Sequence, residues 1–475
     1  MMSRGVRRRL QQGILRFIMR LGCSEEVTAH AGLTLVVEAA RALGLDEIVA
    51  RRLKIAKRKR GFSEVEKLAA LLLLSAAGGE RIEDIRMLSD DQGLTRLLEQ
   101  KLPSPDALLD FLTTFDDPTV WDQRPPDEKS FVPPETAPLD ALFEVNRELV
   151  ARAADPTTTT ATIDHDGTII EAHKRDATIT YEGTRGYQPL VGVWVEQDLI
   201  IGDEFRDGNV PGNKNPLSSV QRMFAALPAW VQKRFFRGDS AAYYTPLLKY
   251  LAAEQIGFSI SADMSPELRA CCAAVPAADW VELSVRARQT VHVAEIEFTP
   301  GAWPKTATPL RYGALRFTPV QGELFAESGL KYLAVVTNRP APEAPNAPHG
   351  DELAATALVN WHWEKAGTIE HGHRCMKDEL GAGVLPSQRF GANAAWFRIN
   401  AITYNVLTFL KRRALPARLR DARPKRLRFE LFTVAARLTL HQSQLAANLA
   451  AGAERTAELM LARQRLLESY ASLPA

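Results

Sequence analysis

The fold is decided by the stretch Arg237-Gly-Asp-Ser-Ala-Ala-Tyr-Tyr244, which is centred on Asp239. Residues 233–237 have the character of a short strand, and leucines at helical spacing follow the stretch between 247 and 251. A strand that ends in a carboxylate and a turn before a helix is typical of α/β sheets, whose active sites collect at strand ends. We therefore expect partners for Asp239 elsewhere, and the acidic stretches at 163–168 and 368–371 are the candidates.

Length and composition exclude several classes of protein. The chain has 475 residues, too many for one ordinary domain, and its apolar fraction of 46% and charged fraction of 24% are those of a globular protein with a sizeable core. The longest largely apolar run, 68–77, is too short to cross a membrane, and no signal-type segment follows the basic N-terminus. We expect a cytoplasmic protein of two to four structural units.

Cysteine and histidine spacing argues against a zinc site. The cysteines have no CxxC spacing, which favours reduced thiols in a reducing compartment. His371 and His373 flank Glu370, but side chains two residues apart on a helix diverge and do not form the i, i+4 pair of a zinc protease.

The order of predicted strands and helices indicates an α/β core. Strands are predicted at 158–166, 168–172, 190–195 and 199–205, a helix at 220–226, and then the Asp239 strand with its helix and a strand from Gly257. Three antiparallel strands followed by strands that alternate with helices is the order of a ribonuclease H-like unit, although the same strands could build other α/β folds.

The remaining chain divides by composition. We expect a helical N-terminal DNA-binding region (1–115), a Pro-rich linker with a helix (116–156), the first part of the core (157–263), a β-rich insertion (264–345), a core completion that carries Glu370 (346–410), and a basic helical C-terminal region (411–475). In the N-terminal region, Ser63 and Glu66 have the spacing of a capping box at the start of a strongly apolar helix.

Basic residues are concentrated in two places. In the run 51–60, seven of ten residues are basic, and this density without interleaved acids favours phosphate contact over a solvated helix face. Its members include Arg51, Arg52, Lys57, Arg58, Lys59 and Arg60. A second cluster between 411 and 428 is another candidate for phosphate contact.

The acidic residues suggest a metal site. Asp164 and Asp166 are alternate residues of one strand and project from the same face, where two carboxylates repel each other unless a cation lies between them. Glu370 is followed by His373, Arg374 and Lys377 at helical spacing, which is typical of a carboxylate bordered by phosphate-binding groups. For each acid alone, an ordinary surface charge is the simpler interpretation.

Several stretches together resemble the DDE transposases of bacterial insertion sequences, in the group that has a β-rich insertion between the second Asp and the Glu. These stretches are Asp164-His-Asp-Gly-Thr, Tyr187-Gln-Pro-Leu, Arg237-Gly-Asp-Ser-Ala-Ala-Tyr, Val335-Val-Thr-Asn-Arg and Trp363-Glu-Lys-Ala-Gly-Thr-Ile-Glu-His-Gly-His-Arg-Cys-Met-Lys. The last is similar to the Tyr-x2-Arg-x3-Glu-x6-Lys signature of that family. The resemblance extends over roughly 68–410.

The resemblance implies a catalytic triad of Asp166, Asp239 and Glu370, with Lys377 in contact with DNA. Asp166 fits the Asp-x-Thr context of the first acid, and Asp164 remains the alternative and a further candidate metal ligand. The chain departs from the signature at two positions, where Trp363 replaces Tyr and Ala366 replaces Arg, so Lys365 is the neighbouring cation that could replace the lost phosphate contact.

The implied activity is two-metal phosphoryl transfer on DNA. Three carboxylates would hold two Mg²⁺ ions, or Mn²⁺, about 3.5–4 Å apart during cleavage and joining at terminal inverted repeats. The implied partners are double-stranded DNA, both transposon ends and target, and a second copy of the chain on that DNA, in the nucleoid. Within the insertion, Trp303 is a candidate for stacking on a flipped base, with a buried core position as the alternative. A transposase-derived DNA-binding protein without activity and a metal-dependent nuclease are the alternative functions.

Overall fold

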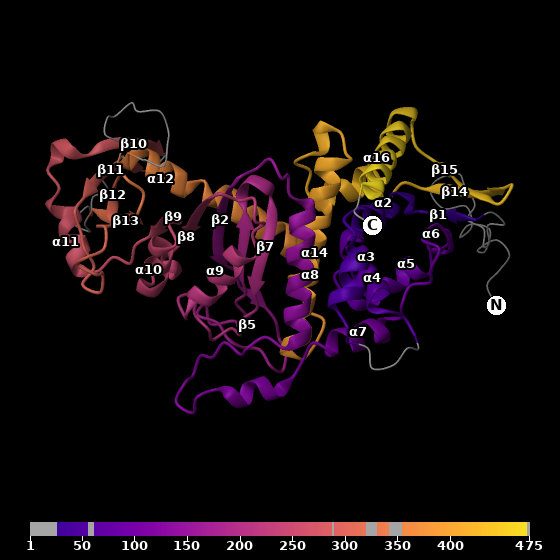
Figure 1. Cartoon of the computed structure of the whole chain (residues 1–475), viewed down its shortest axis with the longest axis horizontal. Coiled ribbons are helices and arrows are strands. Elements are labelled where there is room, and N and C mark those ends of the chain that lie inside the picture. Colours follow the sequence, from indigo (N-terminus) through magenta and orange to yellow (C-terminus); the bar gives the residue numbers. More distant parts are fainter. Residues whose placement is uncertain (1–25, 56–60, 287–288, 320–329, 342–353, 473–475) are drawn as a thin grey trace, which may run out of the picture.

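The computed structural model describes residues 26–55, 61–286, 289–319, 330–341 and 354–472. Figure 1 shows an elongated molecule in which a β-rich end, a central sheet flanked by helices, and a helical end follow one another along the long axis. The chain passes through the helical end twice, because the first helices and the last helix of the sequence lie there together. The sheet and the long helices beside it therefore separate the two ends.

A nine-stranded mixed sheet forms the centre and the β-rich end. Its strand order is β10-β11-β12-β13-β9-β8-β2-β6-β7. The strands are β2 (Thr160–Gly167), β6 (Leu190–Trp194), β7 (Leu199–Glu204), β8 (Lys233–Gly238), β9 (Gly257–Ser261), β10 (Val281–Arg286), β11 (Gln289–Ile296), β12 (Arg311–Pro319) and β13 (Lys331–Thr337).

The central five strands have the predicted order. The strands β2, β6 and β7 are successive antiparallel neighbours, and β8 and then β9 add in parallel on the other side of β2. All five residues of β6 are buried, as expected of a strand that is covered on both faces. This arrangement is consistent with a ribonuclease H-like core and brings the carboxyl ends of β2 and β8 to one edge.

The segment predicted as a β-rich insertion continues the core sheet. The strand β13 pairs with β9 through Val336 and Ile260, and β12, β11 and β10 follow in antiparallel order. The strand β10 was not predicted from the sequence. It lies at the sheet edge, and its apolar residues Val281 and Val285 are exposed, so the buried alternation that reveals β11 is missing there.

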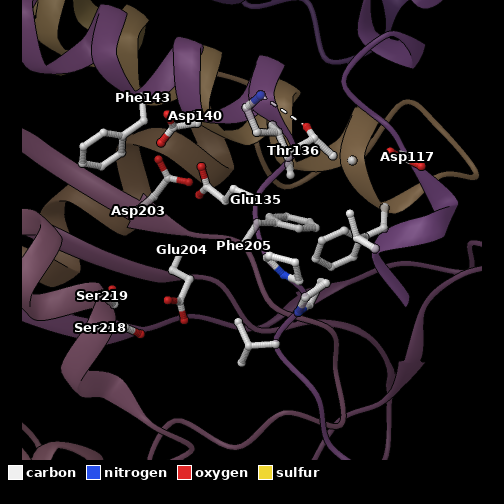
Figure 2. Close-up of a pocket in the computed structure, with 18 of the residues that line it drawn as sticks. Asp117, Glu135, Thr136, Asp140, Phe143, Asp203, Glu204, Phe205, Ser218 and Ser219 are labelled. Atoms are coloured by element: carbon white, nitrogen blue, oxygen red, sulfur yellow. Dashed lines mark hydrogen bonds between the residues drawn. The ribbon is translucent and has the colours of Figure 1, made fainter. Parts of the chain in front are cut away.

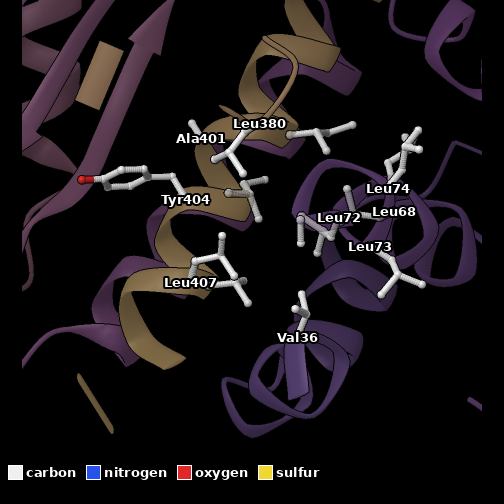
Figure 3. Packing of buried hydrophobic residues seen from close by; sticks show 14 of the residues in the cluster. Val36, Leu68, Leu72, Leu73, Leu74, Leu380, Ala401, Tyr404 and Leu407 are labelled. Atoms are coloured by element: carbon white, nitrogen blue, oxygen red, sulfur yellow. The ribbon is translucent and has the colours of Figure 1, made fainter. Parts of the chain in front are cut away.

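Helix α14 (Phe390–Arg413) joins the sheet to the helical end, and nearly all of its residues are buried. Figure 3 shows Leu407 on the side of α14 that faces Leu72 and Leu73 of α4 (Glu64–Ala77), whereas Tyr404 points away from them. Asn405 bonds both backbone groups of Ile200 in β7, which attaches α14 to the sheet.

The other helices are distributed along the molecule, with α10, α11 and α12 at the β-rich end (Figure 1). They are α2 (Thr34–Ala42), α3 (Leu45–Arg52), α5 (Ile85–Ser89), α6 (Gln92–Leu97), α7 (Pro105–Thr113), α8 (Ala137–Ala153), α9 (Pro216–Ala225), α10 (Thr245–Ala253), α11 (Pro266–Ala274), α12 (Ala355–Trp363), α13 (Lys365–Arg374), α15 (Pro424–Leu427) and α16 (Ala453–Ala471). The capping box predicted at Ser63 is present, with reciprocal bonds between Ser63 and Glu66.

Two expectations for the terminal regions are wrong. The N-terminal region is not entirely helical, because β1 (Val27–Thr28) pairs with β14 (Ala436–His441). The C-terminal region is not entirely helical either, because β14 and β15 (Gln444–Leu449) form a hairpin. Leu440 on this hairpin is exposed, so the strands bury too little apolar surface to give a clear sequence signal.

A small three-stranded sheet, with order β3-β5-β4, lies after β2: β3 (Ile170–Glu171), β4 (Thr178–Ile179) and β5 (Arg185–Tyr187). Among the residues that the structure describes, no helix is both long and apolar enough to cross a membrane.

Candidate active site

Asp166 and Asp239 lie at neighbouring strand ends. The strands β2 and β8 are parallel, and His165 of β2 lies opposite Gly238 of β8. Asp166 and Asp239 directly follow these two residues and therefore lie side by side. Asp239 accepts a hydrogen bond of 3.0 Å from the Ala241 backbone and thereby caps a short 3₁₀ turn. Burial, and then the negative charge of Asp166, raise the pKa of the Asp239 carboxyl. Asp166 is thus the partner acid expected for Asp239 at a neighbouring strand end, whereas the like-charged pair predicted from strand spacing was Asp164 with Asp166.

Lys365 supplies a cation to this pair. Its ammonium donates to Asp166 Oδ2 at 2.7 Å, while Asp166 Oδ1 accepts from the Gly167 backbone at 2.9 Å. The Lys365 side chain is 11% exposed and that of Asp166 is 25% exposed, so the contact lies at the edge of solvent. Lys365 is the first residue of α13, and the helix therefore carries a positive charge directly to the strand end.

Asp164 is paired differently, although it lies on the same strand face. Arg237 of β8 donates to both of its oxygens, at 2.6 and 3.0 Å, and the two side chains are 0% and 1% exposed. Arg237 also donates to the Trp361 carbonyl at 2.6 Å and to Glu364 at 2.9 Å. Thr368 donates to Asp164 as well. Because Asp164 is fully buried against a bidentate guanidinium, whereas Asp166 is 25% exposed, the geometry favours Asp166 over Asp164 as the first acid.

Glu370 does not join the two aspartates in this structure. Helix α13 buries Ile369 and Gly372 against the sheet, whereas Glu370 is exposed on another face. In the described part of the chain, no three His, Cys, Asp or Glu residues are grouped so that they could hold a metal ion. Asp166 and Asp239 are hard oxygen donors whose charge one ammonium compensates only in part, and they fit a divalent ion, but Glu370 as it lies does not complete the site.

Two imidazoles near these acids are electrically neutral. Burial lowers the pKa of His373 to about 4 and that of His165 to about 3. Both ring nitrogens of His373 are buried, and neither has a hydrogen-bond partner among the described residues. The predicted cation at His373 is therefore absent at neutral pH, because the ring is uncharged.

The predicted DNA contacts around α13 lie in three different environments. Lys377 lies in the π-helical turn (Cys375–Glu379) that follows α13, Arg374 is the last residue of α13, and Trp363 is the last residue of α12. Lys377 donates to the Ile169 carbonyl at 2.7 Å and to the Thr168 hydroxyl at 3.2 Å, in the segment that follows β2. Arg374 is exposed, and Trp363 packs partly buried against a small cluster that includes Leu358. Only the first of these side chains is held against the Asp166 strand.

The aromatic candidate in the insertion is a core residue. Trp303 is 5% exposed, belongs to the apolar cluster beneath the sheet, and donates its indole N–H to the Thr308 carbonyl at 3.1 Å. The expectation of an exposed aromatic for base stacking is therefore wrong, because the indole is consumed in packing and in a local turn.

Several arginines of the basic stretches are engaged in ion pairs. Arg51 and Arg52 both bond Glu148 of α8 and so attach α3 to that helix. Lys57, Arg58, Lys59 and Arg60 lie outside the described residues. In the second cluster, Arg418 and Arg426 bond Glu430, and Arg423 bonds Glu379. DNA contact by either stretch stays a prediction, and the observed role of these arginines is to tie helices together.

A polar cavity of about 670 Å³ lies near the same edge of the sheet, between the segment 116–137, β7 and α9. The register places Asp203 of β7 across Val191 from Asp166. Figure 2 shows the carboxylates of Asp203, Glu135 and Asp140 gathered on one side of this cavity.

These acids are already compensated by arginines. Arg398 of α14 bonds Asp203 at 2.9 Å and Glu135 at 2.6 Å. Burial alone would raise the pKa of Glu135, but Arg398 and Arg222 lower it to about 2. Burial nevertheless leaves the pKa of Asp203 raised. Each of these three acids has an arginine partner, whereas Asp239 accepts hydrogen bonds only from the backbone among the described residues.

Comparison with known proteins gives the family. Residues 22–470 match the sequence profile of the family described as "Transposase DDE domain group 1". The chain belongs to the DDE transposases of this group. A solved structure titled as the piggyBac transposase synaptic complex with hairpin DNA is similar, with 13% identity, a TM-score of 0.40, and coverage of 84% of this chain and 79% of that one. No curated protein matches.

The sequence did not predict the cations that bind Asp164 and Asp166 in this transposase. It indicated Arg237 only as part of the motif around Asp239, and Lys365 only as a candidate DNA contact. Arg237 and Lys365 are both far in sequence from the acids that they bind. The signal that could have suggested these pairs is that each cation lies in a motif that also contains a candidate catalytic acid, Asp239 for Arg237 and Glu370 for Lys365.

Proposed function

We propose that this transposase cleaves DNA at the terminal inverted repeats of an insertion sequence and joins the ends to target DNA, with divalent cations as cofactors. The observation that carries the proposal is the pair of carboxylates, Asp166 and Asp239, at adjacent strand ends with incompletely compensated charge. Family membership supports the same reaction class.

The residues have distinct parts in this proposal. Asp166 and Asp239 would hold the cation, and Glu370 on the same helix as Lys365 is the third acid. When bound, divalent cations would lower the pKa of the attacking hydroxyl and stabilise the leaving oxygen. Lys377 is held against the segment after β2 and would contact a phosphate there.

The test is strand cleavage and joining with Mg²⁺ on duplexes that carry the inverted repeats flanking the gene. We expect Asp239→Asn and Glu370→Gln to abolish both reactions while DNA binding persists. Ser240→Ala is a matched control, because the exposed Ser240 follows Asp239 directly without an acidic group. Undiminished cutting by Asp239→Asn would refute the proposal.

One observation favours a second function, that of a DNA-binding protein without catalysis. Glu370 is exposed and lies apart from the two aspartates, and Ala366 lacks a phosphate-binding group. In that case the wild-type protein would bind the repeats but would neither cut nor join them with any divalent cation. A nuclease, the third candidate, would cut without joining.

A further inference from the structure

Lys365 occupies an unusual position for a DNA-contacting lysine. Its backbone begins α13 immediately after the junction with α12, and Arg237 fixes that junction through the Trp361 carbonyl and Glu364. Its side chain is only 11% exposed, and its ammonium donates to Asp166. The side chain is thus directed at the carboxylate by an anchored backbone.

The charge that Lys365 supplies is insufficient for the site. One ammonium faces two carboxylates at neighbouring strand ends, and its hydrogen bond goes to Asp166. In the described residues, Asp239 accepts hydrogen bonds from backbone donors and from no side chain. A cation of higher charge would therefore be favoured at the same place.

The chemistry of lysine permits exchange. An ammonium is a compact charge on a flexible four-carbon stem, whereas a guanidinium binds a carboxylate through two parallel bonds. Lys365 makes a single hydrogen bond with Asp166, through Oδ2. A divalent ion held by Asp166 and Asp239 would need the negative charge of that same carboxylate. Lysine and divalent ion then compete for one carboxylate.

We propose that Lys365 is an internal counter-ion of the DNA-free transposase, and that a divalent cation must displace it from Asp166 in order to bind. This inference rests on the proposed function, because it uses the same two aspartates. It gives Lys365 a role that differs from simple phosphate contact: it weakens cation binding until it is drawn away.

The experiment measures Mn²⁺ binding to the full chain without DNA, by the electron paramagnetic resonance signal of free Mn²⁺. Removal of the competing ammonium in Lys365→Met is expected to tighten Mn²⁺ binding by about tenfold. Lys365→Gln removes the charge but keeps a hydrogen-bond donor, and it should show the same gain if Lys365→Met does not fold.

The matched control is Lys214→Met, which removes another partly exposed lysine–carboxylate pair, with Glu128. Its Mn²⁺ affinity should equal that of the wild type. Equal or weaker Mn²⁺ binding by both Lys365 variants overturns the inference. Asp239→Asn separates this failure from that of the proposed function: if Asp239→Asn leaves Mn²⁺ binding unchanged, the aspartates do not hold the cation and both ideas fail.

Discussion

Two ion pairs lie next to each other on strand β2 and differ in almost every physical property. The sealed pair, Asp164–Arg237, is bidentate and fully buried. The open pair, Asp166–Lys365, has a single contact and a partly exposed acid. Asp164 and Asp166 are alternate residues on the same strand face, so the local sequence does not distinguish them. They are distinguished by the cation that each one binds.

The difference shows how one strand can serve structure and chemistry together. A buried guanidinium with both carboxylate oxygens satisfied is costly to break, so the sealed pair fixes β2, β8 and the α12–α13 junction relative to one another. An ammonium at the edge of solvent is held weakly and can exchange. The rigid pair thereby positions the exchangeable one. Four changes, in order of decreasing effect, test this division.

The largest effect is expected at the acid of the open pair. Asp166→Asn should reduce strand cleavage by on the order of 10³–10⁴-fold, because the loss of a cation-binding carboxylate removes several kcal/mol of transition-state stabilisation. Single-turnover cleavage with Mg²⁺ measures it, and a circular dichroism melt should show an unchanged fold. If Asp166→Asn lowered the stability of the fold as much as Arg237→Met does, the two pairs would not differ in their structural role.

The next effect concerns the cation of the sealed pair. Arg237→Met leaves Asp164 buried without its charged partner and should lower the free energy of unfolding by about 3–5 kcal/mol. Urea denaturation gives this value. Arg374→Met is the control, because Arg374 is exposed on α13 and its removal should cost less than about 0.5 kcal/mol. A loss below about 1 kcal/mol for Arg237→Met would mean that the sealed pair is not structural.

A smaller effect of opposite sign is expected at Asp239. The pKa of its carboxyl is raised above the ordinary 3.8 by burial and by Asp166. Its contribution to stability is therefore present below pH 3.8 and is lost as the pH rises through the raised folded value. Asp239→Asn, which can still cap the turn, should stabilise the cation-free protein at pH 7 by no more than about 1 kcal/mol.

This gain should vanish in acid. Urea denaturation of Asp239→Asn and wild type at several pH values, without divalent cations, provides the measurement. If the variant is less stable than the wild type at pH 7, the carboxylate charge is compensated in the folded state and the basis for cation binding at this edge is lost.

The smallest effect belongs to the cation of the open pair. Lys365→Met should change the free energy of unfolding by less than about 1 kcal/mol, because a single contact near solvent contributes little to stability. Urea denaturation beside Arg237→Met makes the comparison direct. A cost as large as that of Arg237→Met would show that both pairs are structural.

Much of the central fold could be predicted from local patterns. The alternation of apolar residues predicted β2, β6, β7, β8 and β9 to within a few residues, and the capping box at Ser63 is present as the sequence indicated. These features depend on side-chain period or on contacts three residues apart, which a sequence displays directly.

Other features depend on residues that are distant in sequence. The joining of the insertion to β9 and the pairing of β1 with β14 were not predictable, because each needs a partner from another segment. The ion pairs of Arg51 and Arg52 were not predictable for the same reason, because Glu148, which binds both, lies on another helix.

The sequence by itself determined the family-like set of acids and the strands and helices that carry them, because motif spacing and periodicity are local. Only the tertiary structure decided that Asp164 is sealed by Arg237, that Asp166 meets Lys365, and that Glu370 stays in solvent. The physical reason is that the state of a carboxylate depends on burial and on the nearest cation. Both are set by the packing of β8 and α13 against β2.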